Sequence, residues 1–317
     1  MQGSVSINDR LKLLEQTDKI IFNSFWSRSR FVLNLPSTID NKKLEVIHQS
    51  TSKTKVIFNK KKNIISFIGK LNSSKGYDVF GKAMLKILNK YKDWKAIVIG
   101  DEPRQKYFFK HKNLIHLGYK TNTYILNTLK EVSIAVVPSR WDEPFGRSSL
   151  EAASRGCALI LSNTGGLRET SNHSIVLKQI NESELFTKIE YLIKHKKIRL
   201  DLQKRTYKDF KLTNISAAKK IDNLRNDLFS KKINISRQIN EPLKIIHITN
   251  FNERFDGRLH YNTGKRINNG LIRLGHNILN ISDRDIISNY KSIRDPKGVK
   301  ILNNKIISSA ENFNPDL

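Results

Sequence analysis

Cysteine, acidic residues and long apolar runs are all scarce in this chain of 317 residues, and each shortage excludes a class of protein. The one cysteine, Cys157, excludes an internal disulfide framework, and it has no histidine or cysteine near it at metal-ligand spacing. No apolar run reaches the ~18–20 residues that span a bilayer. Residues 1–10 lack the apolar core of a signal peptide. These absences favour a cytoplasmic protein.

Acidic side chains are outnumbered by basic ones, 29 to 57, which gives a formal net charge of +28. The lysines are spread along the whole chain among many asparagines and isoleucines, a pattern more typical of composition bias and a solvated basic exterior than of one partner. A basic surface also attracts anionic lipids or nucleic acid. Because no RNA-recognition motif, zinc finger or basic zipper accompanies the charge, we expect no specific nucleic-acid partner. Peripheral contact with an anionic membrane, at the inner face of the cell membrane, is compatible with the charge.

Short apolar runs alternate with helical patterns, which predicts βαβ units and a doubly wound parallel sheet, a Rossmann-like α/β fold. The predicted strands are Lys19–Phe22, Leu44–His48, Ile64–Ile68, Ala96–Ile99, Leu114–Leu117, Ile134–Val137, Ala158–Ser162 and Ile175–Leu177. The predicted helices are Val79–Tyr91, Tyr124–Glu131, Gly146–Arg155, Leu167–Ser171, Ser183–His195, Ile198–Phe210 and Ile215–Phe229.

These elements divide the chain into four parts. Residues 52–229 form one complete α/β domain with a helical extension, and residues 230–242 form a polar linker. Residues 1–51 hold too few strands for a sheet, so we expect the tail of a preceding domain. Residues 243–317 begin a second α/β domain that stops before its sheet closes. Pieces this short cannot bury a self-sufficient core, so we expect a chain cut at both ends.

The pattern of the last part is a strand, a turn, a helix and a strand. The predicted segments are Leu243–Thr249, Arg254–Gly257, Lys265–Leu274, which Gly275 closes, and Asn277–Ser282. Asp283-Arg284-Asp285 follows the last strand and has the Asp-x-Asp form of a metal motif. We expect a solvated or salt-bridged loop there, and no metal site.

Two carboxylates, eight positions apart, border one predicted crevice. The apolar run Ile134–Val137 stops at Pro138, a polar loop carries Glu143, and Glu151 lies in the helix that follows. Open α/β sheets bind ligands at such strand–loop–helix turns. The pair could be a glycosidase-like general acid and base, or merely a first-turn helix charge and an exposed side chain. Hydroxyl recognition is the better interpretation, because the neighbouring free amides suit an anionic ligand.

Several other polar loops follow predicted strands. Gly69-Lys70-Leu71-Asn72-Ser73-Ser74-Lys75-Gly76 sets two lysines beside a helix N-terminus, which suits a diphosphate, although exposed lysines on a loop are usually just solvated. Its glycine spacing is not that of a Walker A loop. The turns Ile99-Gly100-Asp101, Leu117-Gly118-Tyr119 and Gly165-Gly166-Leu167-Arg168-Glu169 are individually ordinary. Gly118 and Tyr119 could also place backbone groups against a base.

The order and spacing of these motifs resemble the C-terminal domain of GT-B-fold retaining glycosyltransferases, specifically glycosyltransferase family 4, over about residues 18–229. The resemblance implies that Lys70 and Lys75 hold the diphosphate of a nucleotide sugar such as a UDP- or GDP-hexose. Lys70 stands where the family usually has arginine, so the bidentate fork is lost. It further implies that Glu143 contacts the hexose and Glu151 the ribose, and that amides around Phe145, Gly146 and Arg147 face the phosphates.

The expected activity is therefore retaining hexosyl transfer, by front-face attack and without a metal or other cofactor. The expected catalytic residues are Glu143, Lys70 and Lys75, and the expected donor-binding residues are Glu151, Phe145, Gly146, Arg147, Gly69, Gly118 and Tyr119. The resemblance and the basic charge favour a cell-surface glycan or lipid-linked acceptor. Residues 243–317 look like the start of the acceptor-side domain of another such enzyme. The alternatives are an inactive donor-binding module, a basic nucleic-acid-binding protein, and a phosphorylase-like enzyme, for which no pyridoxal-binding motif is present.

Overall fold

The computed structural model describes residues 6–103, 109–231, 241–251, 263–292, 295–296 and 298–317. The chain divides into two compact units, Met1–Lys232 and Ile233–Leu317. The domain boundaries predicted from the sequence within the first unit stay predictions. In the part of the chain that the structure describes, no helix combines the length and the apolar content needed to cross a bilayer.

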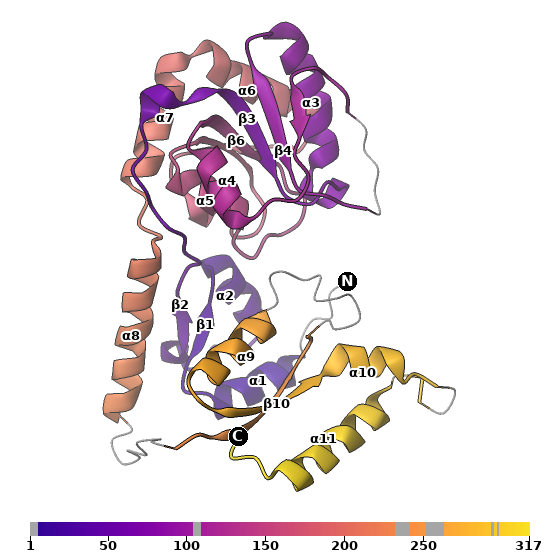
Figure 1. Ribbon diagram of the computed structural model, residues 1–317. Coiled ribbons are helices and arrows are strands. Elements are labelled where there is room, and N and C mark those ends of the chain that lie inside the picture. The colour runs from indigo at the N-terminus through magenta and orange to yellow at the C-terminus, as the bar shows by residue number, and fades with distance from the viewer. Residues whose placement is uncertain (1–5, 104–108, 232–240, 252–262, 293–294, 297) are drawn as a thin grey trace. The chain divides into compact units, whose positions relative to one another are not determined.

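A six-stranded parallel sheet forms the centre of the first unit, in the order β5-β4-β3-β6-β7-β8 (Figure 1). Its strands are β3 (Lys62–Ile68), β4 (Lys95–Ile99), β5 (Leu114–His116), β6 (Val132–Val137), β7 (Ala158–Ser162) and β8 (Ser174–Leu177). The chain runs outward from β3 to β5 and then returns to β6 on the other side of β3. This reversal is the topological switch point of a doubly wound fold, where ligands bind at the carboxyl ends of the strands.

Helices cover both faces of this sheet. They are α3 (Tyr77–Lys90), α4 (Asn122–Leu129), α5 (Arg147–Ser154), α6 (Glu182–Lys194) and α7 (Lys196–Lys208). The last helix of this unit, α8 (Asn214–Lys231), extends away from the sheet (Figure 1). The predicted helix Leu167–Ser171 is instead a short 3₁₀ turn, η4 (Leu167–Thr170). Two other 3₁₀ turns are η2 (Phe58–Lys60) and η3 (Ser73–Lys75). The α/β class and the parallel sheet predicted from the sequence are confirmed.

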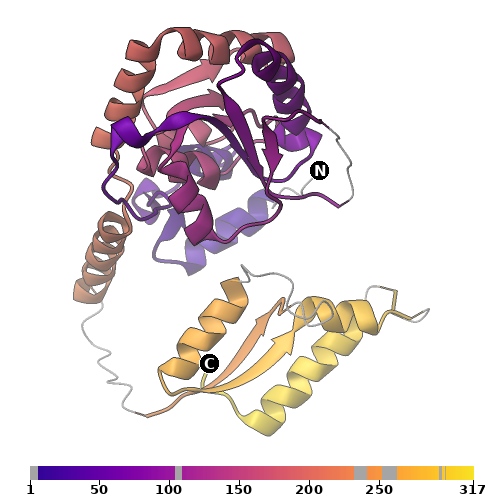
Figure 2. The same ribbon diagram turned by 45° about the horizontal axis from the view of Figure 1, so that its top comes forward.

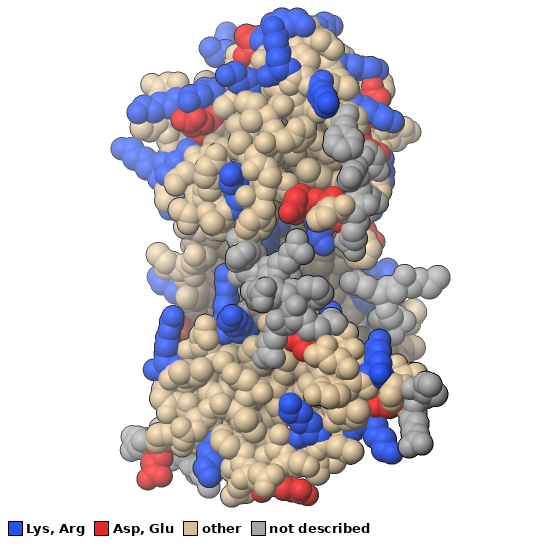
Figure 3. Space-filling view, turned by 45° about the vertical axis from the view of Figure 1, so that its right-hand side comes forward, with Lys and Arg blue, Asp and Glu red and all other residues tan. Residues whose placement is uncertain are grey.

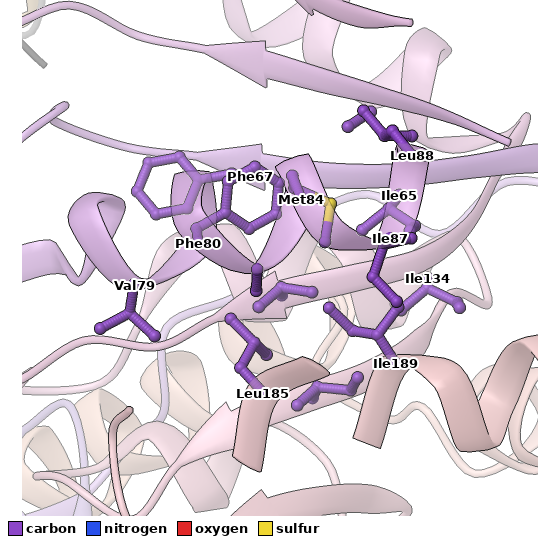
Figure 4. Packing of buried hydrophobic residues seen from close by; sticks show 14 of the residues in the cluster. Ile65, Phe67, Val79, Phe80, Met84, Ile87, Leu88, Ile134, Leu185 and Ile189 are labelled. Carbon is purple, nitrogen blue, oxygen red and sulfur yellow. The ribbon is translucent and has the colours of Figure 1, made fainter. Parts of the chain in front are cut away.

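Helices α3 and α6 pack on one face of the sheet because their apolar residues recur three and four positions apart. Figure 4 shows the contact, in which Phe80, Met84 and Ile87 of α3 and Ile189 of α6 surround Ile65 and Ile134 of the central strands. Helices α4 and α5 cover the other face through a separate cluster that includes Leu129, Leu150 and Phe145. Each core anchors one of the loops that leave the central strands, since Leu71 packs against the first cluster and Phe145 belongs to the second.

Residues 7–46 form a smaller layer of the same unit. Helix α1 (Ile7–Gln16), strand β1 (Ile20–Phe22), helix α2 (Phe25–Val32), the 3₁₀ turn η1 (Asn41–Lys43) and strand β2 (Leu44–Val46) follow one another. Strands β1 and β2 pair in parallel. Farther along the chain, the Thr51 amide donates to the Leu212 carbonyl at 3.1 Å, before the first strand of the large sheet begins at Lys62.

The second unit contains β9 (Lys244–Thr249), α9 (Thr263–Arg273), β10 (Asn277–Ser282), α10 (Asp283–Asn289) and α11 (Val299–Phe313). Its two strands pair in parallel and lie between the orange helix α9 and the yellow helix α11 in Figure 2. The strand–helix–strand order agrees with the sequence prediction, while the predicted turn Arg254–Gly257 lies outside the described residues.

The loop predicted at Asp283-Arg284-Asp285 is wrong, because these residues begin helix α10. Two acids in a first helical turn are favoured by the positive end of the helix dipole. Asp285 is buried and accepts a hydrogen bond from the Ser282 hydroxyl at 2.5 Å. Among the described residues, no group of three or more His, Cys, Asp or Glu side chains could hold a metal ion.

Lysine and arginine side chains are spread over the face of the molecule in Figure 3 and do not gather into one patch. This distribution agrees with a solvated basic exterior, the first interpretation of the +28 net charge.

Candidate functional site

Two loops leave the carboxyl ends of β3 and β6 and are joined along their length. We call residues 69–76 the first loop and residues 138–146 the second loop. The Ser74 carbonyl accepts from the amides of Arg140 at 2.9 Å and Trp141 at 3.0 Å. The Arg140 guanidinium donates hydrogen bonds to both carboxylate oxygens of Asp78, in the first turn of α3, at 2.7 and 2.9 Å. The two loops predicted to hold a nucleotide sugar are thus fixed to each other before any ligand arrives.

The close approach of the two loops requires glycine at position 76. Gly76 has a φ of +71°, and a Cβ there would lie 2.0 Å from the Pro138 carbonyl oxygen. Gly100 has the same relation to the first loop, since its Cβ would lie 1.9 Å from the Gly69 carbonyl oxygen. The Gly100 amide in turn donates to the Gly118 carbonyl at 2.9 Å. The turns at Gly100 and Gly118, which are individually ordinary, are therefore in contact with each other and, through Gly100, with the first loop.

Lys75 and Glu143, which the resemblance assigns to different parts of a ligand, form an ion pair with each other. Glu143 Oε1 also accepts from the Ser139 hydroxyl at 3.0 Å. Both side chains of the ion pair are partly covered, 28% exposed for Lys75 and 15% for Glu143. Lys70, in contrast, is exposed and forms no ion pair within the described residues. The two lysines predicted as a pair therefore have different environments.

Glu151 lies in α5 and is 4% exposed, which removes the alternative of a merely exposed side chain. Its Oε1 accepts from the Asn122 side-chain amide at 2.7 Å and from the Arg147 guanidinium at 3.0 Å. Burial raises the pKa of this carboxyl, although Arg147, Asn122 and Arg155 act in the opposite direction. Its partners are all donors, as the hydroxyls of a ribose would be.

Helix α5 begins just beyond Glu143, at Arg147, and directs its N-terminus toward the second loop. Gly146 stands at the cap position with a φ of +105°, and no described side chain caps this end of the helix. The Phe145 side chain is buried at 1% exposure, so only its backbone is available to a ligand. An uncapped helix N-terminus favours an anion, which is the chemistry that the predicted phosphate position requires.

Gly165 and Gly166 set the position of the Glu143 backbone. The Gly166 amide donates to the Glu143 carbonyl at 2.7 Å. A Cβ on Gly165 would lie 2.1 Å from that same carbonyl oxygen. Sequence reasoning treated this turn as ordinary and also missed Ser139 and Asn122 as partners of the two glutamates. Ser139 lies two residues after the end of β6, a usable signal, whereas nothing in the sequence near Asn122 relates it to Glu151.

The predicted base-binding residues lie beyond the end of β5. Gly118 has a φ of +65° with open space around it, and Tyr119 is 46% exposed. The fold therefore places Gly69, Gly118 and the two loops at one edge of the sheet, with Tyr119 exposed beside Gly118.

Glu151→Gln is expected to raise the Tm at pH 8 and to weaken nucleotide binding. Because its pKa is raised in the folded state, the fold holds a proton that the unfolded chain has released, and stability falls as the pH rises through that window. Glutamine is neutral throughout, so the gain in Tm should be largest above the raised pKa and vanish below the ordinary value of 4.5. Thermal melts from pH 4 to pH 8 test this, with the exposed Glu131→Gln as the control that should show no such trend.

Several curated proteins are similar to this chain. A 42.6 kDa protein in the cps region of Klebsiella pneumoniae is 31% identical over 181 residues, which are 50% of this chain and 47% of that protein. The lipopolysaccharide core biosynthesis mannosyltransferase LpsB of Rhizobium meliloti is 26% identical over 50% of this chain and 48% of its own length. The chain spans about half the length of these relatives.

Solved glycosyltransferases of the GT-B type share the fold. HepE of Anabaena, solved in complex with UDP-glucose, matches with a TM-score of 0.57 at 15% identity, over 70% of this chain and 68% of its own. A glycosyltransferase from Rickettsia africae matches with a TM-score of 0.57 at 20% identity, over 71% of this chain and 68% of its own.

The model of one protein family, the glycosyl transferases group 1, matches residues 48–209, which are about half of the chain. The matched range contains the whole six-stranded sheet, both loops and the two glutamates. This chain therefore belongs to the glycosyl transferases group 1.

Proposed function

We propose that this chain carries the nucleotide-sugar-binding half of a retaining hexosyltransferase of glycosyltransferase family 4. The observation that carries the proposal is the Lys75–Glu143 ion pair at the switch point, with the buried Glu151 on the helix that follows. One cation, one hydroxyl acceptor for a hexose and one for a ribose are thus held between loops that are already fixed to each other.

In the proposed complex, the diphosphate lies between Lys75, Lys70 and the N-terminus of α5. Lys75 would exchange its contact with Glu143 for the phosphate, and this exchange would free Glu143 to accept from a sugar hydroxyl. The same cations would stabilise the charge that develops as the nucleoside diphosphate leaves, which is the main electrostatic term in such a reaction. We propose that this charge stabilisation needs no metal, and that the acceptor hydroxyl attacks from the side of the leaving group.

Glu151 would accept from the ribose hydroxyls in place of Arg147, which is 58% exposed and able to turn toward the phosphates. The amides around Phe145, Gly146 and Arg147 would complete the phosphate site. HepE was solved with UDP-glucose, so UDP is the first nucleoside diphosphate to test, and GDP is the second.

A cell-surface glycan or lipid-linked acceptor is proposed from the relatives. One is a lipopolysaccharide core mannosyltransferase, and another is encoded in a cps region. Such an acceptor would place the protein in the cytoplasm at the inner face of the cell membrane, where its basic exterior suits anionic lipids. Because the chain spans about half of these relatives, it could also bind a donor without transferring the sugar.

Titration of the folded protein with UDP, GDP, UDP-glucose and GDP-mannose tests the donor site. We expect one of these to bind at sub-millimolar concentration and to raise the Tm by mass action. Lys75→Ala should weaken the binding of that nucleotide ~10-fold or more, since charge-assisted contacts contribute roughly 1.5–3 kcal/mol. The exposed Lys95→Ala, at the start of β4, is the control. Absence of binding by all four ligands at millimolar concentration would overturn the proposal.

A further inference from the structure

Glu169 is an acidic residue of the matched region whose partners lie in the distant N-terminal segment. It lies in η4, three positions after Gly166, whose amide holds the Glu143 carbonyl. Its Oε2 accepts from the Phe25 amide at 2.7 Å, and its Oε1 accepts from the Trp26 amide at 2.9 Å. These are the first two N–H groups of helix α2, which have no partner within the helix. A side chain from over 140 positions away thus caps α2.

His48 is the third partner of the same carboxylate. Its Nε2 lies 2.9 Å from Glu169 Oε2. The imidazole also packs between two aromatic rings, Phe25 at 5.4 Å and Phe145 of the second loop at 5.3 Å between centroids. We call Glu169, Phe25, Trp26 and His48 the Glu169 clamp. It joins two separate pieces of the N-terminal segment, residues 23–48, at a single carboxylate.

The clamp lies directly against the second loop. The Ser27 hydroxyl donates to the Pro144 carbonyl at 3.3 Å. A Cβ on Gly166 would lie 2.6 Å from that carbonyl oxygen and 3.0 Å from the Ser24 Cβ, so helix α2 and the loop leave no room between them. Any movement of α2 is therefore transmitted to residues 144–145, which connect Glu143 to the N-terminus of α5.

We propose that Glu169 is a positioning residue, which fixes the N-terminal segment and the second loop to each other and thereby sets Glu143 for the sugar. This role rests on the proposed function. Both carboxylate oxygens of Glu169 accept from the other clamp residues. Glu169 therefore acts through these neighbours and does not touch the donor. A misplacement of about 1 Å in such a site can cost ~10²-fold in rate, which is enough to make a remote clamp essential.

A carboxylate suits this position better than any other side chain. Three donors converge on two oxygens, and two of the donors belong to a helix N-terminus that favours negative charge. Glutamine offers one oxygen and would turn its NH₂ group toward a backbone N–H. Glu169→Gln therefore keeps the size of the side chain and breaks the clamp.

The test compares Glu169→Gln with Glu184→Gln. Glu184 is a matched control, because its oxygens also accept from two backbone amides, those of Lys178 at 2.7 Å and Gln179 at 2.6 Å, next to the edge strand β8. We expect Glu169→Gln to speed hydrogen exchange at the Phe25 and Trp26 amides at least ~10-fold, while Kd for UDP or GDP changes less than ~3-fold. The added affinity of the nucleotide sugar over the bare nucleotide should be lost. Glu184→Gln should change none of the three.

Each of the other possible results would overturn one part of the proposal. Unchanged exchange at Phe25 and Trp26 in Glu169→Gln would overturn the clamp. A large loss of bare-nucleotide affinity would make Glu169 a donor contact and overturn the positioning role. If the wild type binds no nucleotide, the proposed function falls and the positioning role with it, even where the exchange data show the clamp. If Glu169→Gln does not fold, His48→Phe keeps the ring contacts, removes one hydrogen bond, and should give the same pattern with smaller changes.

Discussion

Glu143→Gln is expected to reduce sugar transfer about 10²- to 10³-fold, the usual effect of removing one transition-state contact, while affinity for the bare nucleoside diphosphate is kept or increased. The reason is the ion pair with Lys75. In the free protein the Glu143 carboxylate is paired with Lys75, which the diphosphate needs. Replacing the carboxylate with a neutral amide therefore removes a group that competes with the phosphate for Lys75. The sugar loses its acceptor at the same time, and a contact that strengthens in the transition state affects the rate of the chemical step when it is removed.

The comparison variant is Glu151→Ala, which should lower the affinity for the bare nucleotide. Glu151 is buried beside Asn122 and Arg147, and its proposed ligand is the ribose, which both the nucleotide and the nucleotide sugar contain. Calorimetry with the nucleoside diphosphate and with the nucleotide sugar separates the two residues. Equal losses of bare-nucleotide affinity in both variants would show that the assigned roles are wrong.

Gly165→Ala is expected to cost several times more stability than Gly118→Ala, although both glycines have a left-handed backbone. Gly165 has a φ of +55° and Gly118 a φ of +65°, so each alanine carries the backbone cost of about 1–2 kcal/mol. At position 118 the new Cβ meets nothing within 4 Å, whereas at position 165 it lies 2.1 Å from the Glu143 carbonyl oxygen. That contact is backbone against Cβ, so the second loop must move.

The expected Tm loss is ~2–4 °C for each kcal/mol in a unit of this size. For Gly118→Ala the loss should be a few degrees, with the preference for the nucleotide sugar over the bare nucleotide kept, because both ligands contain the base. Gly165→Ala should lose more than twice as much, and its remaining folded fraction should no longer distinguish the nucleotide sugar from the bare nucleotide, because Glu143 is displaced. Similar Tm losses in the two variants would mean that the turn and the second loop are not in contact in solution.

The residue order was sufficient to predict the α/β architecture, and the candidate site residues stay a prediction. Strand and helix patterns depend on residues two to four positions apart, which any reader of the chain can see. The predicted strands agree with β1 to β10 within one or two residues at their ends. Some strands begin earlier than predicted because pairing extends them: Val132 joins β6 because it lies opposite Lys62 of β3. Strands β1, β2, β5 and β9 are one or two residues shorter than predicted. No helix range was predicted for α1, α2, α10 or α11. The Asp-Arg-Asp segment at the start of α10 in particular resembles a loop when viewed alone.

Contacts between distant residues were decided by the tertiary structure alone. The Lys75–Glu143 pair joins residues 68 positions apart, and the Glu169–His48 contact spans 121 positions. The burial of Glu151 depends on Asn122 and on the packing of α5, which no local pattern records. A sequence pattern reports the preference of the backbone and the sidedness of an element. Which side chains meet at the carboxyl ends of the strands follows from sheet order and loop contact, and these determine the charge, the burial and therefore the chemistry of each group.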